Sequence, residues 1–279
     1  MNKAFALQTL LFSIGIITMT APASLSENIR VVITRKIQPG QYNLQGTCFT
    51  TIDRVEGESA LHGAYAVDIK GLMNVNEPKG GSEYGSIKVG TLTFTRPGSK
   101  KPVIAPGSVI LIHKKSSEEL DFLYKGRSLD QELIDSLSAI LPEDQSPLAP
   151  DSSQMIFVGS SDRHKPGDSW AVNAKNLAVS LGRDNVLDLK SVSGQVKLNK
   201  IKSEGLHPCA EVGCTLSYDS TLDGCKQHTK QIYCWEAPLD LTLPVVSFSG
   251  STYIKAKVGS AMCSTTRAAS TEFVPQLSK

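Results

Sequence analysis

Alternating apolar residues, interrupted by Pro-Gly pairs, constrain the fold of this chain more than any other feature. Every second residue is apolar or glycine in Leu61–Ile69, and the same alternation in Ile29–Ile37 is broken only by Arg35. A period of two is typical of a strand with one buried face. In Ile87–Thr95 the alternation changes phase at Gly90, which predicts a β-bulge at that glycine.

Four Pro-Gly pairs lie beside these strand-like runs. Proline presets the backbone for the second position of a type II turn, and glycine accepts the positive φ of the third. The pairs are Pro39-Gly40, Pro97-Gly98, Pro106-Gly107 and Pro166-Gly167. Further strand-like runs are Val192–Ile201, Leu239–Phe248 and Tyr253–Val258. We therefore expect a mainly β protein whose antiparallel sheets form two β-rich halves.

One amphipathic helix is expected near residues 128–141, packed on a sheet. Ser128 is the predicted N-cap, Gln131 is its capping-box partner, and Pro142 ends the helix. A stripe of apolar side chains at helical spacing favours packing against a sheet, with a lipid- or partner-binding face as the alternative. The stripe consists of Leu129, Leu133, Ile134, Leu137, Ile140 and Leu141.

The N-terminus has the pattern of a cleaved signal peptide at residues 1–23. Lys3 precedes an uncharged stretch, Ala4–Thr20, and Ala21-Pro22-Ala23 has the small-x-small pattern of a cleavage site. No later stretch is long and apolar enough to span a membrane. We expect a periplasmic or secreted protein with a β-rich half at 24–141, a Pro-rich linker at 142–154 and a second half at 155–279.

Composition narrows the functional classes. The 279 residues are 40% hydrophobic, which is too high for a disordered chain. The net charge of +2 and the 6% aromatic content offer neither a basic surface nor a stacking platform for nucleic acid. Neither a phosphate-binding loop nor a dinucleotide fingerprint is present, and we expect no cofactor.

Six cysteines follow the predicted signal peptide. An even number in an oxidising compartment favours disulfide bonds, although sequence cannot choose among the fifteen connectivities. One pairing joins Cys209 to Cys214, Cys225 to Cys234 and Cys48 to Cys263. The alternative is a metal site, because thiolate and imidazole ligands at short spacing can surround zinc. Its candidate ligands are Cys209, Cys214, Cys225 and His228.

Gly167-Asp168-Ser169 is the sharpest enzyme-like motif. In secreted hydrolases this tripeptide can precede an exposed nucleophilic serine, with His62 or His164 as the candidate base here. The residues that follow Ser169 lack the glycines of a chymotrypsin-like oxyanion hole. The other interpretation is a structural turn, Pro166 to Asp168, that leads into a strand anchored by Trp170.

The order of a helix, Leu141-Pro142, the Pro166–Trp170 segment and Val192–Leu198 resembles that of uncharacterised secreted bacterial proteins with a Gly-Asp-x-Trp turn. The resemblance implies a bacterial envelope setting and a β-rich fold, and no activity. We expect an exported, non-catalytic envelope protein that binds a ligand or a protein partner, with an apolar ligand as one form of this hypothesis. The alternatives are a secreted serine hydrolase that uses Ser169 and a structural or adhesive surface protein.

Overall fold

The structure, a computed structural model, describes residues 29–30, 39–76, 83–97, 99–114, 120–141, 158, 160, 162–181, 185–202, 208–239 and 247–276. The predicted signal peptide, the predicted linker and most of the strands predicted at 29–37 and 239–248 lie outside these residues. In the described part, no helix is long and apolar enough to cross a membrane.

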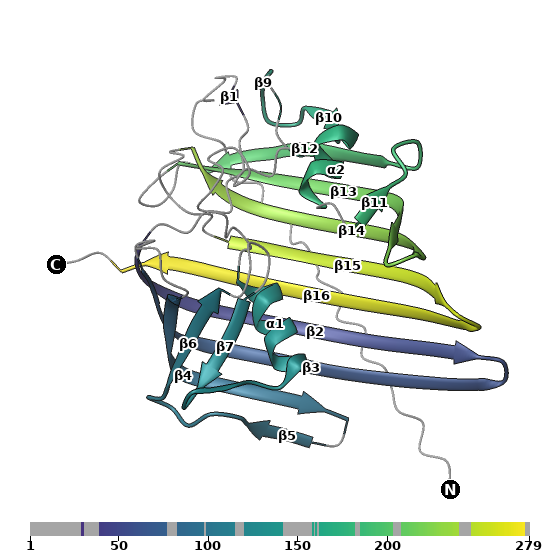
Figure 1. The fold of residues 1–279 in the computed structure, drawn as a ribbon. Coiled ribbons are helices and arrows are strands. Elements are labelled where there is room, and N and C mark those ends of the chain that lie inside the picture. Colours follow the sequence, from purple (N-terminus) through teal and green to yellow (C-terminus); the bar gives the residue numbers. More distant parts are fainter. Residues whose placement is uncertain are drawn as a thin grey trace, which may run out of the picture.

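A 14-stranded sheet and two short helices make up most of the described chain (Figure 1). Every strand pairing in it is antiparallel, so the prediction of a mainly antiparallel β fold is confirmed. The helices are α1 (Gln131–Ile140) and α2 (Ala174–Ser180). The strands are β1 (Ile29–Arg30), β2 (Gly40–Glu56), β3 (Ser59–Val75), β4 (Glu83–Arg96), β5 (Ser99–Pro102), β6 (Val109–Lys114), β7 (Leu120–Tyr124), β8 (Arg127–Ser128), β9 (Arg163–His164), β10 (Ser169–Ala171), β11 (Asn185–Leu187), β12 (Ser193–Lys202), β13 (Cys209–Leu222), β14 (Cys225–Pro238), β15 (Ser247–Val258) and β16 (Ala261–Pro275).

The sheet runs through both predicted halves of the chain. Its order is β10-β12-β13-β14-β15-β16-β2-β3-β4-β6-β7-β8, with β11 paired to β13 and β5 to β4. The last strand, β16, pairs with β2 from Met262 opposite Val55 to Pro275 opposite Tyr42. The junction between the early and late strands is therefore a long, regular strand pairing.

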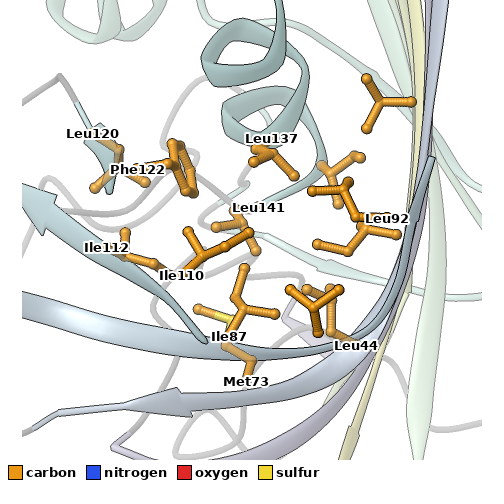
Figure 2. Packing of buried hydrophobic residues seen from close by; sticks show 14 of the residues in the cluster. Leu44, Met73, Ile87, Leu92, Ile110, Ile112, Leu120, Phe122, Leu137 and Leu141 are labelled. Atoms are coloured by element: carbon orange, nitrogen blue, oxygen red, sulfur yellow. The ribbon is translucent and has the colours of Figure 1, made fainter. Parts of the chain in front are cut away.

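Two buried clusters lie on the same face of this sheet. The first is built from β2–β4, β6, β7 and α1, with Phe273 of β16 added; Figure 2 shows Leu137 and Leu141 near α1 among side chains of the strands. The second combines residues of β12–β14 with Leu177 of α2. The strand register places the two clusters on one side of the sheet. Trp235 of the second cluster is opposite Phe248, Phe248 is opposite Thr271, and Thr271 is opposite Gly46, which contacts α1. We call this side of the sheet the helix face.

The bulge predicted at Gly90 and the turn predicted at Pro106-Gly107 are present, whereas Gly40 has φ +151° and begins strand β2 instead of forming a type II turn. The β3–β4 register shifts so that Lys70 pairs with Thr91 and Gly71 with Val89, which leaves Gly90 as the bulged residue. Gly107 has φ +84°, and Ser108 N donates to Ala105 O at 3.2 Å, which closes the turn around Pro106-Gly107. Both features depend on a few neighbouring residues, so their sequence is sufficient to predict them.

The predicted helix is present, but its start was predicted wrongly. Ser128 ends the short strand β8, and its hydroxyl donates to Asp121 Oδ2 at 2.8 Å instead of capping the helix. The N-cap is Asp130, whose side chain makes no capping hydrogen bond. Gln131 donates from Nε2 to Asp135 Oδ1 at 2.8 Å. A hydrogen bond to a residue of β7 therefore takes the serine that the capping pattern predicts as the N-cap.

Candidate functional site

A groove on the helix face lies between α1 and strands β14–β16. It has a volume of about 500 Å³. One wall is formed by α1 and the residue that follows it, and the other by the sheet, so an occupant would contact protein on two sides. Its lining residues are Asp135, Ser138, Ala139, Leu141, Tyr233, Trp235, Phe248, Gly250, Thr252, Ile254, Thr265, Arg267 and Ala269.

Aromatic side chains form one end of the groove. Tyr233 and Trp235 lie on the helix face because alternate residues of a strand share a face, and Phe248 is directly opposite Trp235. The ring centroids are 5.2 Å apart for Tyr233–Trp235, 5.8 Å for Tyr233–Phe248 and 6.3 Å for Trp235–Phe248. These separations are within the range of favourable aromatic pairs.

Gly250 makes room for these rings. A Cβ atom at this position would lie 2.5 Å from Tyr233 Cδ1 and 2.9 Å from Phe248 Cζ. Such distances are closer than non-bonded carbon atoms approach, so a larger residue would displace the rings. The absence of a side chain at position 250 therefore leaves the space that the two rings occupy.

The other end of the groove is polar. Arg267 lies two residues along β16 from Ala269. Its Nη2 donates to Asp135 Oδ2 of α1 at 3.5 Å. Thr252 is directly opposite Arg267 on β15, and Thr265 is two residues further along β16. Two residues of strand cover about 6.7 Å. The groove thus changes from aromatic to charged over a short distance along the strands.

Cys48 is a buried thiol near this polar end, opposite Ala269 on β2. Burial raises the pKa of the Cys48 thiol, and the nearby Arg267 charge offsets only part of that effect. A thiol with a raised pKa carries little thiolate at neutral pH and is a poor nucleophile. The polar end therefore favours binding of a charged group over covalent chemistry.

The opposite face of the sheet carries two shallower hollows, of about 380 Å³ and about 610 Å³. Near the smaller one, Lys202 Nζ lies 3.6 Å from Glu211 Oε2 and also contacts Glu236. Burial by itself would raise the pKa of Glu236, but hydrogen bonds from Lys202 and Ser247 and the Lys202 charge lower it overall. These charges are paired with one another, and both hollows have floors of sheet residues.

The structure separates the candidate hydrolase residues. Ser169 lies on β10 and His62 on β3, with six other strands between them, on the order of 30 Å apart. His62 Nδ1 instead lies 2.6 Å from Asp53 Oδ1. His164 stacks on Trp170 with ring centroids 4.1 Å apart, and Ser169, as the neighbour of Trp170 in a strand, points to the other side. Neither histidine is placed to activate Ser169.

Pro166, Gly167 and Asp168 form a turn. Asp168 N donates to Lys165 O at 3.0 Å, Gly167 has φ +97°, and Asp168 Oδ2 accepts from Lys165 N at 3.0 Å. Trp170 follows and donates from Nε1 to Val158 O at 2.8 Å while packing against the second buried cluster. The Gly-Asp-Ser segment therefore has structural contacts throughout.

The candidate metal ligands are also dispersed. Cys209 and Cys214 are five positions apart on β13 and point to opposite faces, since one number is odd and the other even. His228 Nδ1 lies 2.6 Å from Asp219 Oδ1. Among the residues that the structure describes, no three His, Cys, Asp or Glu side chains are grouped to hold a metal ion.

The one pairing named above does not fit this fold, and no disulfide joins the six cysteines in the described structure. Cys209 and Cys214 are about 17 Å apart along β13, and Cys225 and Cys234 about 30 Å apart along β14. Cys263 pairs with Arg54, six residues along β2 from Cys48, or about 20 Å. A disulfide requires Cα atoms within about 7 Å. Proximity in sequence misled the prediction because long strands keep near neighbours far apart.

The groove residues were not predicted as a site. Tyr233 and Trp235, two residues apart in a strand-like run, were a usable signal for an aromatic face. Arg267 lies among small residues of β16, and nothing local identifies its partner Asp135, 132 residues away. The site is assembled by strand register, which the sequence pattern does not specify.

Comparison with known proteins identifies no family. No family model and no curated protein match the chain. Among solved structures, one of lipovitellin on lipid–protein interactions is 8% identical with a TM-score of 0.40, and the match covers 88% of this chain and 26% of that one. A crystal structure of MucB in complex with MucA(peri) is 8% identical with a TM-score of 0.11, covering 85% and 94%. The chain thus spans about a quarter of lipovitellin, and neither likeness is close enough to indicate function.

Proposed function

We propose that this chain is an exported, non-catalytic protein that binds an apolar ligand in the groove between α1 and β14–β16. The groove itself carries the proposal, because a volume of about 500 Å³ is within the usual range of small-molecule sites. The aromatic end offers apolar surface to an occupant, and Ala269, Ala139 and Gly250 leave space beside it. The N-terminal sequence pattern supports the export part of the proposal.

A non-catalytic role is supported by the positions of the candidate catalytic groups. No histidine hydrogen-bonds to Ser169 in the described structure, and the buried Cys48 thiol has a raised pKa. Catalysis by either nucleophile requires a base within hydrogen-bonding reach of it, or a lowered pKa of the nucleophile itself. Binding is the activity that the groove supports without further groups.

Filling the groove from either wall tests this function. Ala269→Leu places a larger side chain on the β16 wall, and Ala139→Leu does so on the α1 wall. We expect each substitution to weaken binding of the fluorescent apolar probe N-phenylnaphthylamine about tenfold, the loss that corresponds to roughly two methylene groups of lost apolar burial.

Ala268→Leu is the matched control. Ala268 is the exposed neighbour of Ala269 on the opposite face, so the same substitution leaves the groove unchanged. Thermal unfolding of all three variants establishes that each is folded. Unchanged probe binding by both groove variants, or the absence of binding by the wild-type chain, would contradict the proposed function.

A further inference from the structure

Arg267 is the one cationic side chain that lines the groove in the described structure. Its only hydrogen bond there is the contact of 3.5 Å with Asp135 Oδ2, which is at the long limit for such bonds. The other carboxylate oxygen of Asp135 accepts from Gln131 at 2.8 Å. The guanidinium is therefore held on one side by a single weak contact.

Arg267 also keeps unused hydrogen-bonding capacity. A guanidinium presents five N–H donors, and Nε of Arg267 is buried with no hydrogen-bond partner among the described residues. The side chain as a whole is 32% exposed, and Arg267 is one of the residues that line the groove. A buried donor without a partner is costly, and a water molecule, an ion or a ligand can satisfy it.

The charged and apolar parts of the groove are separated along the strands. Thr271 and the aromatic Phe248 are paired, Ala269 and Gly250 form the next pair, and Arg267 and Thr252 the one after. From Thr271 to Arg267 is four residues, or about 13 Å of strand. An occupant with one charged end and one apolar end matches this order.

Resting on the binding function proposed above, we infer that the ligand class of the groove is a single-chain amphiphile with an anionic head group. The Arg267 guanidinium binds the carboxylate or phosphate oxygens of the head, and Asp135 holds it from the helix side. The apolar tail lies toward Ala269, Tyr233 and Phe248. Arg267 therefore determines which head group is accepted, while the aromatic end binds the tail.

Three probes with one tail and different heads test this inference. Dodecanoate, dodecanol and dodecyltrimethylammonium are titrated into the folded full-length chain by calorimetry, and acetate represents the head alone. We expect dodecanoate to bind about tenfold more tightly than dodecanol, since hydrogen bonds to a charged group contribute about that factor. We expect the cationic probe to bind more weakly than the alcohol, because it carries the same charge as Arg267.

Variants of Arg267 separate head recognition from support of the fold. Arg267→Gln lowers the affinity for dodecanoate about tenfold and leaves dodecanol binding unchanged, whereas Arg267→Lys retains part of the preference because it keeps the charge. Arg54→Gln removes an arginine that pairs with Glu56 outside the groove and changes neither affinity. A purely structural arginine would affect the acid and the alcohol equally.

The possible failures are distinguishable. Equal binding of dodecanoate and dodecanol, or equal losses of both in Arg267→Gln, overturns the anionic-head inference and leaves apolar binding in place. Acetate that binds as tightly as dodecanoate overturns the amphiphile part by showing an anion site that needs no tail. Absence of binding by all three long-chain probes contradicts the binding function itself.

Discussion

At the scale of single residues, burial sets the chemistry of Cys214. This side chain is 2% exposed in the second buried cluster, and burial raises the pKa of its thiol from 9.0 to about 12. The folded state therefore keeps the thiol neutral at a pH where the unfolded chain already loses the proton. The stability that Cys214 contributes is complete below about pH 9 and is lost as the pH rises toward about 12.

The prediction concerns the pH dependence of unfolding. Between about pH 8 and about pH 10.5, Cys214 should remove about 2 kcal/mol from the free energy of unfolding of the wild-type chain. Cys214→Ala removes the titrating group, so its loss of stability over this interval should be smaller by that amount. Urea unfolding at the two pH values measures the difference.

Val212→Ala is the control for lost volume in the same cluster. Val212 is fully buried and does not titrate, so its substitution should lower stability equally at both pH values. If Cys214→Ala loses as much stability as the wild-type chain on going to high pH, burial of this thiol is not a source of the alkaline instability.

Residue-level features divide into those that sequence predicts and those that it does not. Gly90 and Gly107 were predictable because a bulge or a turn depends on a few neighbouring residues. The Arg267–Asp135 contact was not, because it needs the position of α1 over a particular pair of strands. The cysteine pairings failed for the same reason, since strand length, and not separation in sequence, sets those distances.

At the scale of elements, α1 rests closely on β2 and β16. A Cβ atom at Gly46 would lie 2.3 Å from Ile140 Cγ2, and Thr271 on the far side of Gly46 donates its hydroxyl to the carbonyl oxygen of Ile140. The apolar stripe predicted the buried helix face correctly, with Leu137 and Ile140 fully buried. It did not predict that a glycine would form the contact surface, because the partner strand was unknown.

This contact predicts a strong coupling between two substitutions. Gly46→Ala should lower the free energy of unfolding by about 1–3 kcal/mol through steric overlap with Ile140. Ile140→Ala should lower it by about 2–5 kcal/mol through lost burial. In the double variant the overlap is gone, so the combined loss should be less than the sum of the two.

Denaturant unfolding of the four proteins in this cycle measures the coupling. Ala139→Gly, one residue from Ile140 and half-buried, is a comparison substitution that should combine additively with Gly46→Ala. Losses that add for Gly46→Ala and Ile140→Ala would show that α1 does not rest on Gly46.

At the scale of the whole molecule, the pairing of β16 with β2 joins the early and late strands. Sequence predicted both strand-rich regions and the antiparallel class, but long-range pairing has no local signature, so it indicated two halves. Phe273 shows the consequence, because a residue near the end of the described chain is 1% exposed in a cluster made mainly of residues before 142. The two clusters remain distinct, yet one sheet contains both.

The last prediction follows from this continuity. A specific protease site is inserted between Pro147 and Leu148 in the predicted linker, and the chain is cut there after folding. The pieces should stay together, because the β16–β2 pairing extends from Met262–Val55 to Pro275–Tyr42 and Phe273 is buried among residues of the other piece. Size-exclusion chromatography without denaturant should give a single peak at the mass of the uncut chain, and the same sample in urea should give two.

Adding Phe273→Ala should weaken the association of the cut pieces, since about 3–5 kcal/mol of packing is lost. Separation of the pieces without denaturant would mean that the halves behave as independent domains and that the strand pairing does not hold them together.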